Sequence, residues 1–179
     1  IGDLHIGTTG RTSNIEAVAP PPDHPLYLME RDGGISVGLG DGSTIWFFGD
    51  SMEEFADGSL RYFVNNTAAW ASADAPTLTR DAVSADGEPF LFAAPPPGAC
   101  DASPLPDAAL WPESAVAIPR DDGTDRVVVV MSKVCLSAEN WLDIDLRGYA
   151  VVEFTYDPDD PPVDRPIRGE VIQPDFAAA

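Results

Sequence analysis

Two short apolar segments separated by a glycine-rich turn, within residues 32–51, are the feature that most restricts the fold. Every second residue from 35 to 39 is apolar, as in a half-buried strand, and 45–48 is a continuous apolar run of strand length. Residues 40–43, Gly-Asp-Gly-Ser, are typical of a tight turn between antiparallel strands. The segment therefore predicts a β-hairpin.

The predicted hairpin carries an aspartate at each end. Asp32 precedes the first strand and Asp50 follows the second, so a hairpin brings both carboxylates to the same end of the strand pair. Two neighbouring carboxylates are a candidate catalytic site, because their environments can hold one protonated and leave the other ionised. The simpler alternative is that both strand ends are polar because they meet solvent.

The hairpin pattern returns later in the chain. Residues 114–118 form an apolar strand, 120–125 an Asp-Gly turn and 126–131 a Val-rich strand. Further strands are expected at 61–70, as one strand, and at 88–92, 149–155 and from 168 onward, whereas 52–60 is expected to be a polar loop or a short helical turn. No segment shows sustained helical periodicity, so the sequence predicts an all-β chain.

Repeated hairpins joined by long irregular loops are typical of a β-propeller or of a β-sandwich. The long loops favour the propeller, because sandwiches usually have closely and regularly spaced turns. With 179 residues and only two clear hairpins and part of a third, the chain predicts an incomplete propeller. Residues 1–31 are expected to form an N-terminal arm and 32–179 a single partial domain, either a fragment or one completed by a second chain.

Composition narrows the partners and the location. Ten basic residues against 30 acidic ones give a net charge of -20, which disfavours binding to nucleic acid and to anionic membranes. No apolar run reaches the length of a membrane span, and the first residues lack the features of a signal peptide. We therefore expect no membrane insertion. We expect a secreted or cell-surface protein, and the sequence would then be its processed form, from which a signal peptide has been removed.

The chain has two cysteines, Cys100 and Cys135. A single pair in an exported chain predicts a disulfide, which would close a loop of about 36 residues. Two buried thiols are the alternative.

Several short motifs together resemble a family of secreted five-bladed β-propellers that includes the endo-D-arabinanases acting on mycobacterial-type arabinan. The motifs are Asp-Gly-Gly at 32–34, Trp-Phe-Phe-Gly-Asp at 46–50, Asn-Asn-Thr-Ala-Ala-Trp at 65–70, and Trp-Pro at 111–112 before a Val-rich strand. The resemblance covers roughly residues 32–155. It implies a glycoside hydrolase whose carboxylates lie at the funnel of the propeller.

The resemblance implies which carboxylates would act. Asp32 and Asp50 match the acids that bracket the family's first hairpin, and Glu113 lies in the Trp-Pro segment, where the match is looser. Glycosidic cleavage requires one protonated carboxyl group to assist the leaving oxygen and one ionised carboxylate to attack the sugar or activate water. The predicted catalytic residues are therefore Asp32, Asp50 and Glu113.

Aromatic and amide side chains near these acids are candidates for sugar binding. Trp70 and Trp111 can stack on sugar rings, and Asn65 and Asn66 can bond hydroxyl groups. Core packing is an equal alternative for Trp111, and asparagines at strand entrances more often bond local backbone groups. Trp46, in the middle of an apolar run, is expected in the core.

Other functions fit parts of the sequence. Gly-Asp-Ser at 49–51 resembles the nucleophile block of GDS-type lipases, with Ser51 as nucleophile, but His5 and His24 both precede it and no α/β pattern is present. The acidic residues Asp157, Asp159, Asp160 and Asp164 could bind calcium, although interspersed prolines favour a solvated loop and no cofactor is expected.

A non-catalytic propeller is the main alternative to an enzyme. Such a protein would bind a glycan or a protein partner without cleaving it, within an assembly. The two alternatives differ in whether the aspartates converge on an open site.

Overall fold

The computed structural model describes residues 16–17, 26–55, 59–79, 89–101, 103–137, 140, 143–162 and 165–176. These residues form strands and no helix, which confirms the prediction of an all-β chain. The strands are β1 Glu16–Ala17, β2 Leu26–Arg31, β3 Ile35–Gly38, β4 Thr44–Phe48, β5 Ser51–Phe55, β6 Leu60–Val64, β7 Thr67–Ala71, β8 Leu78–Thr79, β9 Asp107–Pro119, β10 Asp125–Leu136, β11 Ile144–Tyr156 and β12 Glu170–Phe176.

The strands form four sheets. Their orders are β1-β8, β12-β11-β10-β9, β2-β5-β6 and β3-β4-β7. Apart from the short parallel β1-β8 pair, all pairings are antiparallel. The sheets of the described part are open and none closes into a barrel.

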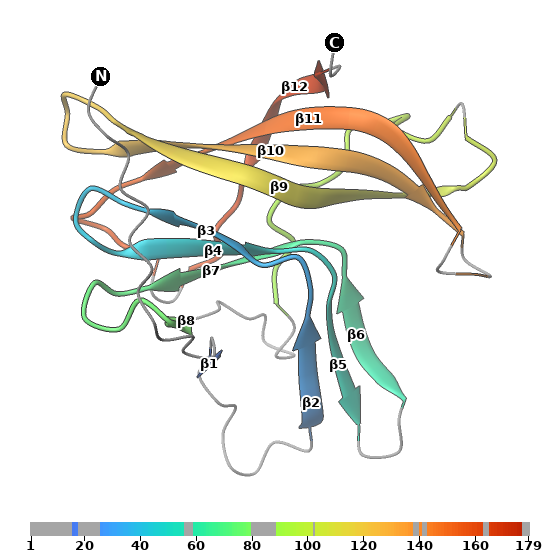
Figure 1. Ribbon diagram of the computed structural model, residues 1–179, viewed down its shortest axis with the longest axis horizontal. Coiled ribbons are helices and arrows are strands. Elements are labelled where there is room, and N and C mark those ends of the chain that lie inside the picture. The colour runs from blue at the N-terminus through green and yellow to red at the C-terminus, as the bar shows by residue number, and fades with distance from the viewer. Residues whose placement is uncertain are drawn as a thin grey trace, which may run out of the picture.

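The two three-stranded sheets are halves of one bent ribbon. Strand β2 leads into β3, β4 into β5, and β6 into β7, each after only two or three residues, and the strand order is the same in both halves. Figure 1 shows β2, β5 and β6 turning sharply away from β3, β4 and β7. The bend runs across residues 32–34, 49–50 and 65–66.

The β2-β5-β6 half of this ribbon differs from the strands that the sequence predicted. Residues 52–55, expected in a polar loop or short helical turn, belong to β5 Ser51–Phe55, which pairs with β2 and β6. The single strand expected at 61–70 is two strands, β6 and β7. Consecutive glutamates and a nearby glycine gave β5 the composition of a loop. Its strand conformation is set by pairing with β2, at least 20 residues earlier in the chain, and local composition does not encode this pairing.

The larger sheet is a meander of long strands that follow one another in sequence order. The predicted hairpin at 114–131 is confirmed, and its strands extend further, to Asp107–Pro119 and Asp125–Leu136. Alternate valines of β10 are buried, as the period of a strand facing a core requires. Strand β11 includes the predicted 149–155 segment, and β12 pairs with its outer edge.

The hydrophobic core lies between this sheet and β3-β4-β7, which face each other in Figure 1. Its members come from both sheets, the turn after β3, the loop after residue 89 and the segment before β12: Val37, Leu39, Ile45, Phe47, Trp70, Phe92, Ala93, Leu110, Val127, Val129, Met131, Ala150, Val152, Tyr156 and Ile167. Phe47 and Phe92 pack with ring centroids 4.9 Å apart. Two sheets packed face to face occur both in a β-sandwich and in neighbouring blades of a propeller.

A polar cluster joins the two sheets at the turn between β3 and β4. The Tyr156 hydroxyl, at the end of β11, donates to Asp41 Oδ2 at 2.6 Å, and Ser43 Oγ donates to Asp41 Oδ1 at 2.6 Å. Burial acts to raise the pKa of Asp41, but the hydrogen bonds from Ser43 and Tyr156 outweigh it and the pKa is lowered. Beside them, Gly40 N donates to the buried carboxylate of Asp125 at 2.7 Å.

We expect Tyr156→Phe to lower the free energy of unfolding by about 1 to 2 kcal/mol at pH 7, because Asp41 loses a hydrogen-bond donor. A lowered pKa means that this stabilisation is present above the ordinary value of 3.8 and is lost as pH falls through the folded-state pKa. The difference between variant and wild type should therefore shrink below about pH 3.8. Urea unfolding at pH 7 and pH 3 measures it, with Tyr149→Phe as control on the same strand. Equal losses at both pH values would contradict this assignment.

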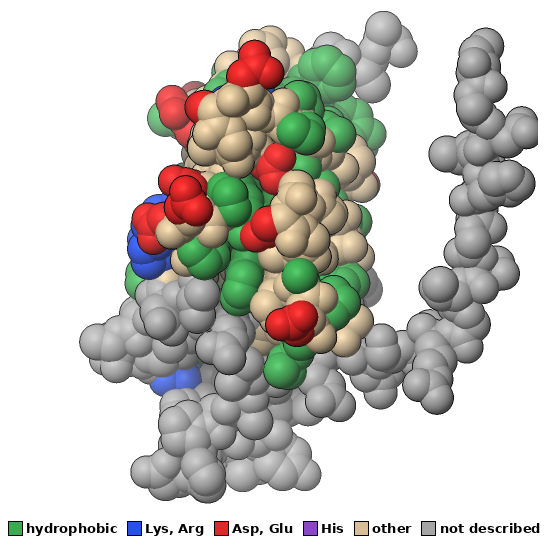
Figure 2. Space-filling view, turned by 90° about the vertical axis from the view of Figure 1, so that its left-hand side faces the viewer, with side chains coloured by type: hydrophobic (Ala, Val, Ile, Leu, Met, Phe, Trp, Pro, Cys, Tyr) green, Lys and Arg blue, Asp and Glu red, His purple; other side chains and the backbone are tan. Residues whose placement is uncertain are grey.

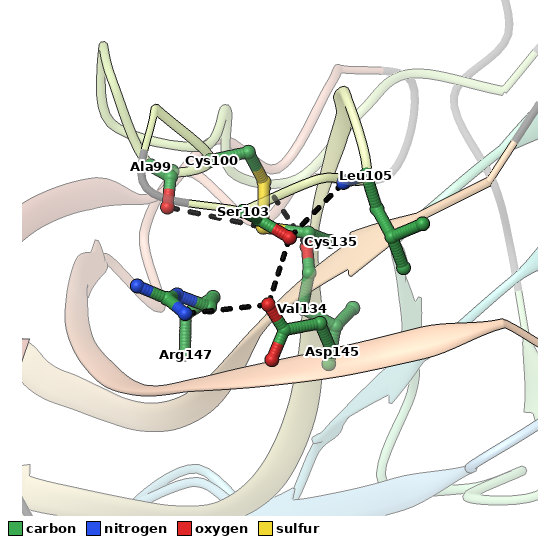
Figure 3. Close-up of a disulfide and its surroundings, with 8 residues drawn as sticks. All are labelled: Ala99, Cys100, Ser103, Leu105, Val134, Cys135, Asp145 and Arg147. Carbon is green, nitrogen blue, oxygen red and sulfur yellow. Dashed lines mark hydrogen bonds and ion pairs between the residues drawn. A yellow bond between two sulfur atoms is a disulfide. The ribbon is translucent and has the colours of Figure 1, made fainter.

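The cysteines form the predicted disulfide between Cys100 and Cys135. It attaches the proline-rich segment after residue 93 to β10, near its end (Figure 3). Ser103 Oγ donates to Asp145 Oδ2 at 2.7 Å and thereby holds the same segment to β11. The alternative of two buried thiols is excluded in this structure.

Candidate functional site

The bend of the ribbon places Asp32 and Asp50 side by side. Asp32 N donates to Asp50 O at 3.1 Å, and Gly49 N donates to Asp32 O at 2.9 Å. A Cβ atom on Gly49 would overlap Asp32 Oδ1, so glycine leaves the space in which the Asp32 carboxylate lies. The aspartates are neighbours, as the hairpin predicted, but they lie where strands bend and continue, not where they end.

Asp50 lies in the middle of the bend and has partners on three sides. Asp32 flanks it on one neighbouring strand, and Asn65, at the junction of β6 and β7, hydrogen-bonds its carboxylate from the other. Trp111, on β9 of the larger sheet, donates from Nε1 to Asp50 Oδ1 at 2.9 Å. The site is therefore built from the bent ribbon and the edge strand of the second sheet.

The two carboxylates differ in environment. Asp50 is half-buried, whereas Asp32 is exposed. Burial raises the pKa of Asp50 above its ordinary value, and the negative charge of Asp32 adds to this effect, while the hydrogen bonds from Trp111 and Asn65 oppose it. A half-buried carboxyl group with a raised pKa beside an exposed carboxylate is the combination from which an acid and a base can be made.

Glu113 lies on β9 at a β-bulge. The pairing of β9 with β10 shifts by one residue between Val130 and Met131, which leaves Glu113 as the extra residue. Its carboxylate is exposed and accepts a hydrogen bond from Ser132 Oγ at 2.5 Å. Bulges re-aim side chains and are common beside active sites. The assignment of Glu113 as a third catalytic carboxylate stays a prediction.

Two of the predicted sugar-binding side chains are buried. Asn66 is fully buried, its Nδ2 donates to Ala93 O at 3.0 Å, and its Oδ1 accepts from Ala93 N at 2.8 Å. Trp70 is 9% exposed and belongs to the hydrophobic core. Neither side chain offers a surface to a ligand here, and we correct both assignments to structural ones.

The remaining aromatic and amide predictions also change. Trp46, expected in the core, is only half-buried and donates from Nε1 to Pro76 O at 3.0 Å on the outer side of β4. Trp111 is half-buried, and its defined contact is with Asp50. Asn65, and not the neighbouring Asn66, hydrogen-bonds the carboxylate of Asp50. Adjacent residues at a strand junction point to opposite sides, so only one of the two asparagines can face this carboxylate.

The lipase alternative loses its nucleophile. Ser51 is fully buried, and its hydroxyl lies 2.8 Å from Thr67 Oγ1 across the bend. A nucleophilic serine requires an exposed hydroxyl beside a base. His5 and His24 lie outside the described residues.

The acidic loop after β11 is a solvated turn. Asp157, Asp159 and Asp160 are exposed, Asp159 N donates to Asp157 Oδ1 at 2.9 Å, and Arg165 pairs with Asp160 at 2.6 Å. In the described part of the chain, no group of three or more His, Cys, Asp and Glu side chains could hold a metal ion. Asp164 lies outside that part.

Further acidic side chains lie at the opposite end of the β3-β4 hairpin from Asp32 and Asp50. Figure 2 faces this end and shows many more acidic than basic side chains. Asp41, Asp121 and Asp122 are exposed in the turns that form it. Among the described residues, no helix is long and apolar enough to cross a membrane.

Comparison with known protein families gives no match, and no curated protein matches the chain. Among solved structures, the chain is similar to the crystal structure of a "putative hydrolase" from Bacteroides ovatus, with 17% sequence identity and a TM-score of 0.46. The similarity covers 80% of this chain but 38% of the other, so this chain spans well under half the length of the structure it matches. A likeness this weak establishes neither a shared family nor a shared activity.

Proposed function

We propose that the chain belongs to a glycoside hydrolase in which Asp50 is the general acid and Asp32 the nucleophile or general base. The observation that supports this proposal most is the pairing of a half-buried carboxyl group of raised pKa with an exposed carboxylate on the next strand. Glycosidic cleavage uses one carboxyl group in each state. The assignment follows from the environments of the two side chains.

In the proposed reaction Asp50 gives its proton to the glycosidic oxygen as the bond to the anomeric carbon breaks. Asp32 either bonds to the anomeric carbon, and water later releases the sugar, or removes a proton from the attacking water. Either route consumes one water molecule and produces one new reducing end. The anomeric configuration of the first product, observed by NMR, distinguishes the two routes.

The proposed substrate is a furanose polysaccharide such as arabinan, which follows from the resemblance of the motifs at 32–34, 46–50 and 111–112 to the arabinan-cleaving propellers. Two contacts between these motifs support the proposal: Trp111 Nε1 donates to Asp50 Oδ1, and Asp32 N donates to Asp50 O. Secretion or attachment to the cell surface is part of the proposal. The disulfide between Cys100 and Cys135 is compatible with that location.

The experiment is incubation of the protein with arabinan, galactan and a pyranose polymer such as xylan, followed by measurement of new reducing ends. We expect new reducing ends from arabinan and none from xylan. Release from xylan alone would overturn the substrate class, and no release from any polymer would overturn the catalytic proposal. Binding to arabinan without release, measured by affinity electrophoresis, would favour the non-catalytic glycan-binding alternative.

We also propose that the larger sheet is a blade of a propeller that further strands complete. Four antiparallel strands in sequence order are the usual form of a blade. On the face of β9 turned away from the core, Val116 is 51% exposed and Ile118 is 44% exposed, as expected for a surface that another sheet covers. Those strands would belong to a longer form of the protein or to a second chain, and size-exclusion chromatography with light scattering tests for the second chain.

A further inference from the structure

The indole nitrogen of Trp111 donates a hydrogen bond to the carboxyl group of Asp50. Indole N–H can only donate a hydrogen bond, and its distance of 2.9 Å from Asp50 Oδ1 is that of a normal N–H···O bond. A carboxyl group that keeps such a bond while it is protonated accepts through its carbonyl oxygen. The acid proton is then carried by the other oxygen, Oδ2.

We infer that Trp111 is a positioning residue that reserves Asp50 Oδ1 as an acceptor and so makes Oδ2 the oxygen that delivers the proton. This inference rests on the proposed role of Asp50 as the general acid. It replaces the expectation that the Trp111 ring binds sugar. The donor comes from β9, the edge strand of the second sheet, so the packing of the two sheets sets the position of the indole N–H at Oδ1.

The surroundings of Asp50 support a tuning role. Asp32 is the charged neighbour whose field acts on Asp50, whereas Trp111 and Asn65 approach it as neutral donors. Both donors stabilise the ionised form and lower the pKa, against the larger effect of burial. Removal of the indole N–H should therefore move the titration of Asp50 to higher pH.

Trp111→Phe tests the inference, since it removes the N–H and keeps an aromatic ring. We expect the carbon-13 resonance of the Asp50 carboxyl group to titrate at higher pH than in wild type, and Asn65→Ala to shift it in the same direction. Trp46→Phe is the matched control, because the same change on the outer side of β4 should leave this titration unchanged. The amide NMR spectrum shows whether each variant is folded.

The titration needs no substrate, so its outcome separates this inference from the proposed function. If reducing ends are released, we expect Trp111→Phe to lower kcat by roughly 10- to 100-fold and to move the alkaline limb of the pH profile upward, with KM little changed. An unchanged Asp50 titration in folded Trp111→Phe would overturn the inference. So would a raised KM with an unmoved pH profile, which is the signature of a sugar-stacking ring.

Discussion

Asp50→Asn is expected to lower the release of reducing ends from arabinan by about 100-fold or more, because an amide cannot donate the acid proton and general acid catalysis contributes about 10²- to 10⁴-fold. Asparagine keeps the size of the side chain and can still accept from Trp111 at Oδ1. The loss therefore reports the missing proton and not a collapsed site. Asp32→Asn should cause a comparable loss, because it removes the ionised carboxylate.

The matched control is Asp121→Asn, which changes an exposed aspartate in the turn between β9 and β10. We expect this variant to keep wild-type activity. The measurement is the initial rate of reducing-end release over pH 4 to 8 for Asp50→Asn, Asp32→Asn and Asp121→Asn. A folded Asp50→Asn protein with more than about a tenth of wild-type activity would remove Asp50 from the role of general acid.

The same Asp50 substitution has a second, opposite effect on stability. A raised folded-state pKa means that Asp50 stabilises the fold below its ordinary pKa of 3.8 and that this stabilisation is lost as pH rises through the folded-state value. Asparagine has no charge to bury, so the Asp50→Asn protein should melt at higher temperature than wild type at pH 7 and at nearly the same temperature at pH 3. A lower melting temperature at pH 7 would contradict the burial argument.

The bend that holds Asp50 is the part of the fold that sequence patterns could not describe. The β3-β4 hairpin and the β9-β10 hairpin were predictable because strand period and Asp-Gly turns are local signals. The bend was not, because it depends on the pairing of β5 with β2, which lies at least 20 residues earlier in the chain and is not encoded by a local turn signal.

The same reason explains which site residues were missed. Asp32 and Asp50 were found from one hairpin, whose two strands fix their proximity. Which of two adjacent asparagines faces Asp50 depends on where β6 ends and β7 begins, and this boundary is set by tertiary contacts such as those of Asn66 with Ala93. The contact of Trp111 with Asp50 spans 61 residues and follows only from the packing of the two sheets.

Removal of the disulfide is expected to have the largest effect on stability. Its two cysteines are separated by 35 residues, and closing a loop of this length stabilises a fold by about 3 to 4 kcal/mol in the chain-entropy description. For a domain of this size the loss corresponds to a melting temperature lower by roughly 10 °C. The double variant Cys100→Ala, Cys135→Ala avoids a free thiol and should show this decrease in differential scanning calorimetry.

Reductant supplies the control for the disulfide prediction. Wild type in dithiothreitol should melt close to the double variant, and the variant should be insensitive to dithiothreitol. Because the disulfide attaches the proline-rich segment to β10, and Ser103 still bonds Asp145 without it, we expect the core sheets to remain folded at 25 °C. A double variant as stable as wild type would show that the segment before β9 is held by its other contacts and that the cross-link adds nothing to them.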